Sequence, residues 1–134
     1  DIQALNENLE QLLQEPVQRL AAKNIKKIIA IGGTATTIAA IYHELSIYDA
    51  AKVHNTYITF AYLNEIFVKL KSMTIEQRYH VIGLQKERAD VIPAGVAIML
   101  QIMQLLGLQG FYASENDNLE GAIIKYAKAE EIRV

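Results

Sequence analysis

The stretch at residues 28–40 decides the fold of this 134-residue chain and reads Ile-Ile-Ala-Ile-Gly-Gly-Thr-Ala-Thr-Thr-Ile-Ala-Ala. Four apolar residues predict a buried strand, two glycines turn the chain, and Thr34 can cap the helix that follows. Such a turn directs backbone N–H groups and the positive end of a helix out of the fold. This arrangement favours an anion, typically a phosphate.

A purely structural explanation of the two glycines also stays open. Gly32 and Gly33 can serve only a backbone with positive φ or a close packing contact. The stretch has neither the lysine of a P-loop nor the glycine spacing of the dinucleotide-binding fingerprint, so neither motif is predicted.

Composition and charge are those of an ordinary globular domain. Hydrophobic residues make up 51% and charged residues 21% of the chain, which is enough for one domain with a core. The net charge is −2 and no basic block occurs, so nucleic-acid binding is not expected. The chain has no cysteine, which excludes disulfides and thiolate chemistry, and we expect a cytoplasmic location.

The longest uncharged stretch, at residues 91–114, is long enough to cross a bilayer. It contains Pro93, three glycines and three glutamines. This composition favours a central core helix at residues 91–106, ended by Gly107, over a membrane span. We therefore expect no membrane association.

Apolar spacing predicts the other elements. Strands are expected at residues 26–31 and 110–114, a loop at residues 49–57, and helices at residues 34–44 and 119–128. Thr59 can cap a helix running to about residue 71, and Thr74 with Gln77 fits a capping box for a short helix that ends before Gly83. In the apolar helical pattern at the start of the chain, Pro16 predicts a kink or a restart of the helix near Glu15.

This order of elements belongs to the α/β class and is rich in helix. The two strands are expected to be parallel neighbours with the helix at residues 91–106 packed centrally. Two parallel strands need neighbours and cover on both faces, so we expect an exposed strand edge and self-association. The chain also opens with Asp1 inside an amphipathic pattern, which predicts a fragment of a longer protein.

Three segments together carry a family resemblance. They are residues 31–37 (Ile-Gly-Gly-Thr-Ala-Thr-Thr), residues 87–95 (Glu-Arg-Ala-Asp-Val-Ile-Pro-Ala-Gly) and residues 114–121, which end in Leu-Glu-Gly. In this order and at these separations they resemble the exopolyphosphatase/guanosine-pentaphosphatase (Ppx/GppA) family. The resemblance covers residues 17–127, and residues 53–54 and 74–78 add to it.

The resemblance implies a helix-rich fragment of an actin-like (ribonuclease H-like) fold with a small parallel sheet. The family has two similar α/β domains with the active site in the cleft between them. Residues 1–134 resemble most of the second domain, while the first domain, with its phosphate loop and catalytic carboxylate, is missing. No residue of this chain is implied as catalytic, and the implied magnesium ion (Mg²⁺) has its ligands outside this chain.

Two departures from the family pattern affect the site. No glycine precedes Gly32, so the family's Asp-x-Gly-Gly-Gly-Ser loop is absent from this chain. The family commonly has Leu-Arg before its Glu-Gly, whereas this chain has Asn118-Leu119 before Glu120, so an arginine ligand is not predicted there.

The candidate phosphate-binding residues are Gly32, Gly33, Thr34 and Arg88. The first three resemble the family turn that faces the cleft and would act through backbone N–H groups. Arg88 is the candidate side chain because a guanidinium binds two phosphate oxygens and keeps its charge. The alternative for Arg88 is a structural ion pair with Asp90 or the neighbouring glutamate.

Other polar residues are interpreted as structural. Asp90 is the predicted N-cap of the long helix and Glu120 a cap of the last helix, while Gly121 is predicted to permit close backbone approach. The three histidines share no metal-ligand spacing, so no metal site is predicted.

These features predict a fragment of a phosphoanhydride hydrolase that removes terminal phosphate from polyphosphate or guanosine pentaphosphate and is inactive alone. Two alternatives stay open: a non-catalytic regulatory or interaction module of the same fold, and the ATP-binding half of a sugar or acetate kinase. Residues 88–95 disfavour the kinase because they resemble the phosphatases. The expected partners are the substrate, the missing first domain and a second copy in a homodimer.

Overall fold

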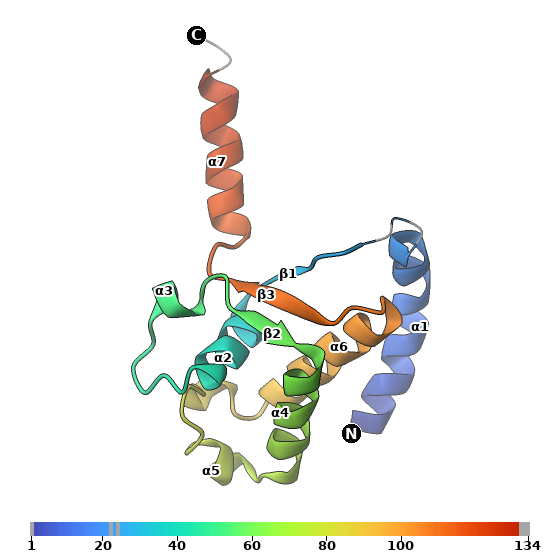
Figure 1. The fold of residues 1–134 in the computed structure, drawn as a ribbon, viewed down its shortest axis with the longest axis vertical. Helices are drawn as coiled ribbons and strands as arrows, with labels where there is room; N and C mark the ends of the chain where they lie inside the picture. The colour runs from blue at the N-terminus through green and yellow to red at the C-terminus, as the bar shows by residue number, and fades with distance from the viewer. Residues whose placement is uncertain (1, 22, 24, 132–134) are drawn as a thin grey trace.

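The fold is that of a computed structural model, which describes residues 2–21, 23 and 25–131. Helices pack on a small sheet and on one another, and the last helix extends away from the body (Figure 1). The elements in chain order are α1 (Ile2–Ala21), β1 (Ile29–Ile31), α2 (Gly33–Tyr42), α3 (Ala50–Val53), β2 (Tyr57–Thr59), α4 (Phe60–Ser72), α5 (Ile75–Arg78), η1 (Lys86–Arg88), α6 (Ile92–Leu105), β3 (Gly110–Ser114) and α7 (Asn118–Glu131).

The sheet has the strand order β1–β3–β2. β1 and β3 are parallel, with Ile31 opposite Ser114, which confirms the predicted parallel pair. β2 is antiparallel to β3, so the sheet is mixed and the expectation of a parallel sheet is wrong in this respect. A strand of three residues is too short to show alternation, and β2 forms through its hydrogen bonds to β3.

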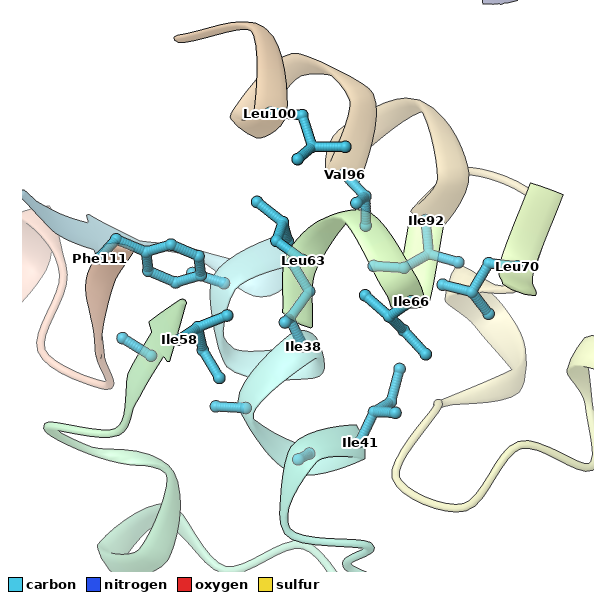
Figure 2. Packing of buried hydrophobic residues seen from close by; sticks show 14 of the residues in the cluster. Ile38, Ile41, Ile58, Leu63, Ile66, Leu70, Ile92, Val96, Leu100 and Phe111 are labelled. Atoms are coloured by element: carbon cyan, nitrogen blue, oxygen red, sulfur yellow. The ribbon is translucent and has the colours of Figure 1, made fainter. Parts of the chain in front are cut away.

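The core lies between the sheet and the helices (Figure 2). Phe111 of β3 and Ile58 of β2 face Ile38 of α2 and Leu63 of α4, and all four side chains are fully buried. Burial of each such side chain contributes about 1.5–3 kcal/mol to folding. The cluster continues away from the sheet with Ile41, Ile66, Leu70, Ile92, Val96 and Leu100.

Helix α6 occupies the centre of the helical layer, with α1 on one side and α4 on the other, which confirms its predicted core position. It ends as predicted at Gly107, where φ is +64° and the backbone N–H donates to the Gln104 carbonyl at 3.2 Å. In the part of the chain that the structure describes, no helix combines the length and apolarity needed to cross a membrane.

The caps predicted at Thr59 and Thr74 agree with the structure, whereas the predicted restart at Pro16 does not occur. Thr59 accepts a hydrogen bond from the Tyr62 N–H at 3.1 Å, and Thr74 with Gln77 forms the predicted capping box. The predicted restart near Glu15 is wrong, because α1 continues through Pro16. Pro16 has no N–H to donate to the Leu12 carbonyl. Leu12 is 72% exposed, so water can reach this part of the helix.

Two predicted segments differ in extent. The strand predicted at residues 26–31 pairs with β3 only over Ile29–Ile31. The loop predicted at residues 49–57 contains the one-turn helix α3, which begins because the Asp49 carboxylate accepts from the Ala51 N–H at 3.0 Å.

The face of the sheet opposite α2 and α4 is open in the described residues. Ile29 is 60% and Ile31 46% exposed on the edge strand β1, so the predicted exposed apolar edge is present. The rings of Tyr57 and Tyr112 pack with centroids 4.9 Å apart, and the Lys27 ammonium lies 4.2 Å from the Tyr112 ring centroid. Self-association through this face stays a prediction.

Candidate phosphate-binding site

The first turn of α2 forms the floor of the candidate site. Gly32 is the N-cap residue, with φ of +86°, and a Cβ at this position would meet nothing within 4 Å. The first backbone hydrogen bond of the helix runs from the Thr36 N–H to the Gly32 carbonyl at 3.2 Å. The N–H groups of Gly33, Thr34 and Ala35 therefore have no acceptor within the helix, which leaves donors for an anion.

The prediction that Thr34 caps α2 is wrong. The helix begins at Gly33, and the N-cap Gly32 has no side chain to accept a hydrogen bond. The Thr34 side chain packs against α6 instead, where its Oγ1 lies 2.6 Å from the position that a Cβ on Gly95 would take. Gly95 thus permits the close approach of α2 and α6, and only the backbone of Thr34 remains for a ligand.

Arg88 lies directly over Gly33. Its guanidinium atoms are 1.8–2.3 Å from the position of a Cβ on Gly33, so the space that the glycine leaves is filled by the arginine. The Nε of Arg88 donates to the Gln85 Oε1 at 3.1 Å. The structure thus joins two candidates that are far apart in the sequence.

The alternative ion pair of Arg88 does not form. Among the side chains that the structure describes, those of residues 8, 9, 11–20, 23 and 25–128, the ion pairs are Arg19–Glu15 and Lys52–Asp49, so none of their carboxylates lies within 4.0 Å of the Arg88 guanidinium. The predicted N-cap role of Asp90 is also wrong, since Val91 is the N-cap of α6 and no side chain caps that helix. Pro93 in the first turn lacks an N–H, which lowers the need for a cap.

The segment that presents Arg88 is fixed at both ends. Arg78 donates from Nε to the Leu70 carbonyl at 2.8 Å and from Nη1 to the Ala89 carbonyl at 3.0 Å. Gly83 packs on α2 so closely that a Cβ would lie 2.4 Å from the Ala40 carbonyl oxygen. These contacts hold η1 against α2 and place the guanidinium over the helix N-terminus.

The third sequence segment begins at the same edge of the sheet, because β1 and β3 are parallel and end together. The Leu119 N–H donates to the Asp117 carboxylate at 2.7 Å, and the Glu120 carboxylate accepts from the Asp117 N–H at 2.8 Å. The predicted capping role of Glu120 is therefore confirmed. The predicted close approach at Gly121 is wrong, since a Cβ there would meet nothing within 4 Å.

A comparison with known protein families identifies this architecture. The family model of the Ppx/GppA phosphatases matches residues 1–130. The chain belongs to the Ppx/GppA phosphatase family. Exopolyphosphatase 2 of Mycobacterium tuberculosis is 30% identical over 118 residues, which are 84% of this chain and 37% of that protein. The bifunctional 3-dehydroquinate synthase/phosphatase of Fusobacterium nucleatum is 31% identical over 99 residues, 73% of this chain and 14% of that protein.

Solved structures show the same fold. A Ppx/GppA family member of Aquifex aeolicus superposes with a TM-score of 0.80 at 26% identity, over 96% of this chain and 41% of that chain. An exopolyphosphatase of Cytophaga hutchinsonii gives a TM-score of 0.81 at 17% identity, over 96% of this chain and 42% of that chain. The fold is therefore that of a helix-rich fragment of an actin-like domain, and the chain spans less than half the length of these relatives.

Sequence reasoning did not find the polar contacts that this Ppx/GppA chain makes at the end of β3. The Tyr48 hydroxyl donates to the Glu115 carboxylate, and the Glu115 N–H donates to His54 Nδ1 at 3.2 Å. Burial raises the pKa of Tyr48, and the hydrogen bond to Glu115 raises it further, while Thr36 and Arg88 lower it. No spacing links these residues, because the β3 register brings them together.

A separate cavity lies at the opposite end of α2. It has a volume of about 490 Å³ and is bordered by Tyr42, Tyr62, Lys69 and His80, among others. None of the residues that line it belongs to the candidate phosphate site.

Proposed function

We propose that this chain is the phosphate-holding part of the second domain of a two-domain phosphoanhydride hydrolase, which removes terminal phosphate from polyphosphate. The observation that supports this most strongly is the Arg88 guanidinium lying on Gly33 at the first turn of α2. Backbone N–H donors and a guanidinium without a carboxylate partner meet at one open edge. A phosphate there would receive main-chain hydrogen bonds and a bidentate guanidinium contact.

In the proposed reaction this chain orients the phosphate and stabilises its charge. Phosphoryl transfer depends largely on positioning and on electrostatic stabilisation of the transferred group. The carboxylate that activates water belongs, in this proposal, to the first domain. Among the described residues no group of three His, Asp or Glu could hold a metal ion, so these residues do not fit a Mg²⁺ site and we assign its ligands to other parts of the protein.

Polyphosphate is the proposed substrate because the Mycobacterium tuberculosis relatives are exopolyphosphatases. Guanosine pentaphosphate has the same terminal phosphoanhydride and is the second candidate. The ratio of kcat/KM for long-chain polyphosphate to that for guanosine pentaphosphate, measured in the complete protein, decides between them. A higher kcat/KM for the nucleotide would transfer the proposal to that substrate.

Arg88 variants of the complete protein test the proposed function. Arg88→Lys keeps the charge but loses the bidentate fork, so kcat/KM for polyphosphate falls roughly ten- to hundredfold while Tm is unchanged. Lys86→Ala, which removes an exposed positive charge of the same helix η1, is the control and leaves kcat/KM near the wild-type value. Full activity in Arg88→Lys together with a lower Tm in Arg88→Ala would assign Arg88 a structural role.

The chain alone is expected to be inactive. The proposed catalytic carboxylate and the other phosphate loop lie outside it, and the reduction of the barrier requires these groups together. Phosphate release from long-chain polyphosphate in the presence of Mg²⁺ measures this directly. Turnover of about 1 per second or more, typical of a complete enzyme, would refute the proposal.

A further inference from the structure

The Tyr48–Glu115 hydrogen bond closes one side of the candidate site. Tyr48 comes from the loop after α2, and Glu115 directly follows β3, at the edge where β1 and β3 end. Ser114 of β3 pairs with Ile31 of β1. Glu115 directly follows Ser114, and the glycine turn directly follows Ile31. The hydroxyl therefore holds a carboxylate at the edge of the sheet where a phosphate would bind.

Hydrogen bonds anchor the loop that carries Tyr48 and thereby fix the position of its hydroxyl. The Asn55 N–H donates to the Ala113 carbonyl at 2.8 Å, and the Glu115 N–H donates to His54 Nδ1 at 3.2 Å. At the other end of the loop, His43 Nε2 and Thr56 Oγ1 are 2.8 Å apart. Together these bonds tie the loop to β3 and to the end of α2.

Charges of both signs act on this one hydroxyl. Burial is the largest cause of the raised pKa of Tyr48. The carboxylate of Glu115 raises this pKa further, and the guanidinium of Arg88 lowers it. Glu115 and Arg88 thus lie within electrostatic range of the same group. They do not pair directly, since the ion pairs of the described residues involve neither of them.

We propose that Tyr48 is a positioning residue for phosphate binding: it holds the Glu115 carboxylate and thereby leaves Arg88 free for the substrate. This inference rests on the proposed function. Without the hydroxyl, the Glu115 carboxylate turns toward Arg88 and competes with phosphate for the guanidinium. The effect requires the negative charge of Glu115, so removal of that charge restores binding.

Calorimetric titration of the complete protein with inorganic tripolyphosphate tests this inference. Tyr48→Phe raises the Kd roughly two- to fivefold, the range of a partly exposed ion pair. Glu115→Gln keeps an acceptor for Tyr48 but loses the charge, so it binds tripolyphosphate at least as tightly as the wild type. The double variant Tyr48→Phe/Glu115→Gln returns to the wild-type Kd. Tyr79→Phe is the matched control, since Tyr79 is 41% and Tyr48 42% exposed.

Each result has a definite meaning. A Kd in the double variant as high as in Tyr48→Phe overturns the inference, because the tyrosine then acts without Glu115. Weaker binding of tripolyphosphate in Glu115→Gln also overturns the inference. If Tyr48→Phe lowers Tm, so that its Kd cannot be interpreted, the Glu115→Gln variant provides the test. Loss of binding in Arg88→Ala with unchanged binding in Tyr48→Phe refutes only the positioning role. Unchanged binding in Arg88→Ala refutes both the proposed function and the inference.

Discussion

At the residue scale, the pairing of Gly33 with Arg88 explains why the second glycine of the turn has no side chain. A Cβ at Gly33 would lie 1.8 Å from a guanidinium nitrogen of Arg88. Gly32, by contrast, has open space around it and needs its positive φ of +86°. Gly32 is thus required by the backbone conformation, whereas Gly33 is required by the position of the Arg88 side chain.

Gly33→Ala is therefore expected to displace Arg88 without unfolding the protein. The atom in the way is the end of a flexible side chain, and Gly33 has no positive φ, so alanine introduces no backbone strain there. We expect an unchanged or higher Tm together with a raised Kd for tripolyphosphate, measured by calorimetry. Gly121→Ala is the control, since a Cβ there meets nothing within 4 Å, and it leaves the Kd unchanged. An unchanged Kd in Gly33→Ala would contradict the role of Arg88.

Tyr62 gives a pH prediction at the same scale. Burial, with the nearby Glu65, Tyr42 and Glu44, raises the pKa of Tyr62 to about 12. An unfolded tyrosine loses its proton near pH 10, so between pH 10 and 12 the native state binds more protons and the free energy of unfolding falls as pH rises. Urea unfolding at pH 9, 10 and 11 measures this fall, which is shallower in Tyr62→Phe. Equal slopes in the wild type and the variant would contradict the raised pKa.

At the scale of elements, the segment between α5 and α6 depends on its contact with α2. Gly83 has φ of +86°, and a Cβ there would lie 2.4 Å from the Ala40 carbonyl oxygen and 2.5 Å from its carbon. Because these are backbone atoms of a packed helix, they cannot move aside cheaply. The contact anchors the segment that leads to η1, which carries Arg88, on the C-terminal part of α2.

Gly83→Ala is expected to destabilise the protein by roughly 2–5 kcal/mol, from the left-handed backbone strain and the steric overlap together. Gly107→Ala is a matched comparison, since Gly107 has φ of +64° and open space, so it loses only about 1–2 kcal/mol from the strain. Chemical denaturation measures both free energies of unfolding. Equal losses in the two variants would show that the contact with Ala40 contributes nothing.

At the scale of the whole molecule, the open sheet face and α7 leave apolar surface exposed. Ile29 is 60% exposed on β1, and α7 exposes Leu119 (66%), Ile123 (60%), Ile124 (55%) and Tyr126 (71%). Figure 1 shows α7 extending away from the body of the fold. Apolar side chains on an unpaired strand edge and on an uncovered helix favour association.

We therefore expect the chain to associate with itself as its concentration rises. Sedimentation velocity over a range of concentrations shows an increasing mass, and Ile29→Lys weakens the association because it places a charge at the edge. Ile47→Lys, at a loop position that is 84% exposed, is the control and leaves the association unchanged. A strict monomer at high concentration would refute the prediction and, with it, the proposed homodimer.

Part of the local structure was predictable from the sequence alone. The strand, glycine turn and helix at residues 28–42 follow from apolar runs and backbone freedom, and the capping box of Thr74 and Gln77 joins residues three apart. The parallel pairing of β1 and β3 also followed, because a long crossover restricts the geometry. The family resemblance also predicts Gly33 and Arg88 as members of one phosphate site, and the structure brings these two residues into contact.

The tertiary structure alone decided the contacts between distant segments. β2 pairs over three residues only because β3 offers hydrogen bonds at its edge, and Thr34 turns to Gly95 rather than capping its helix because α6 lies there. The Tyr48–Glu115 bond depends on a strand register that no local pattern records. Sequence periodicity reports which face of an element is buried, whereas the partner on that face is fixed by the packing of the whole core.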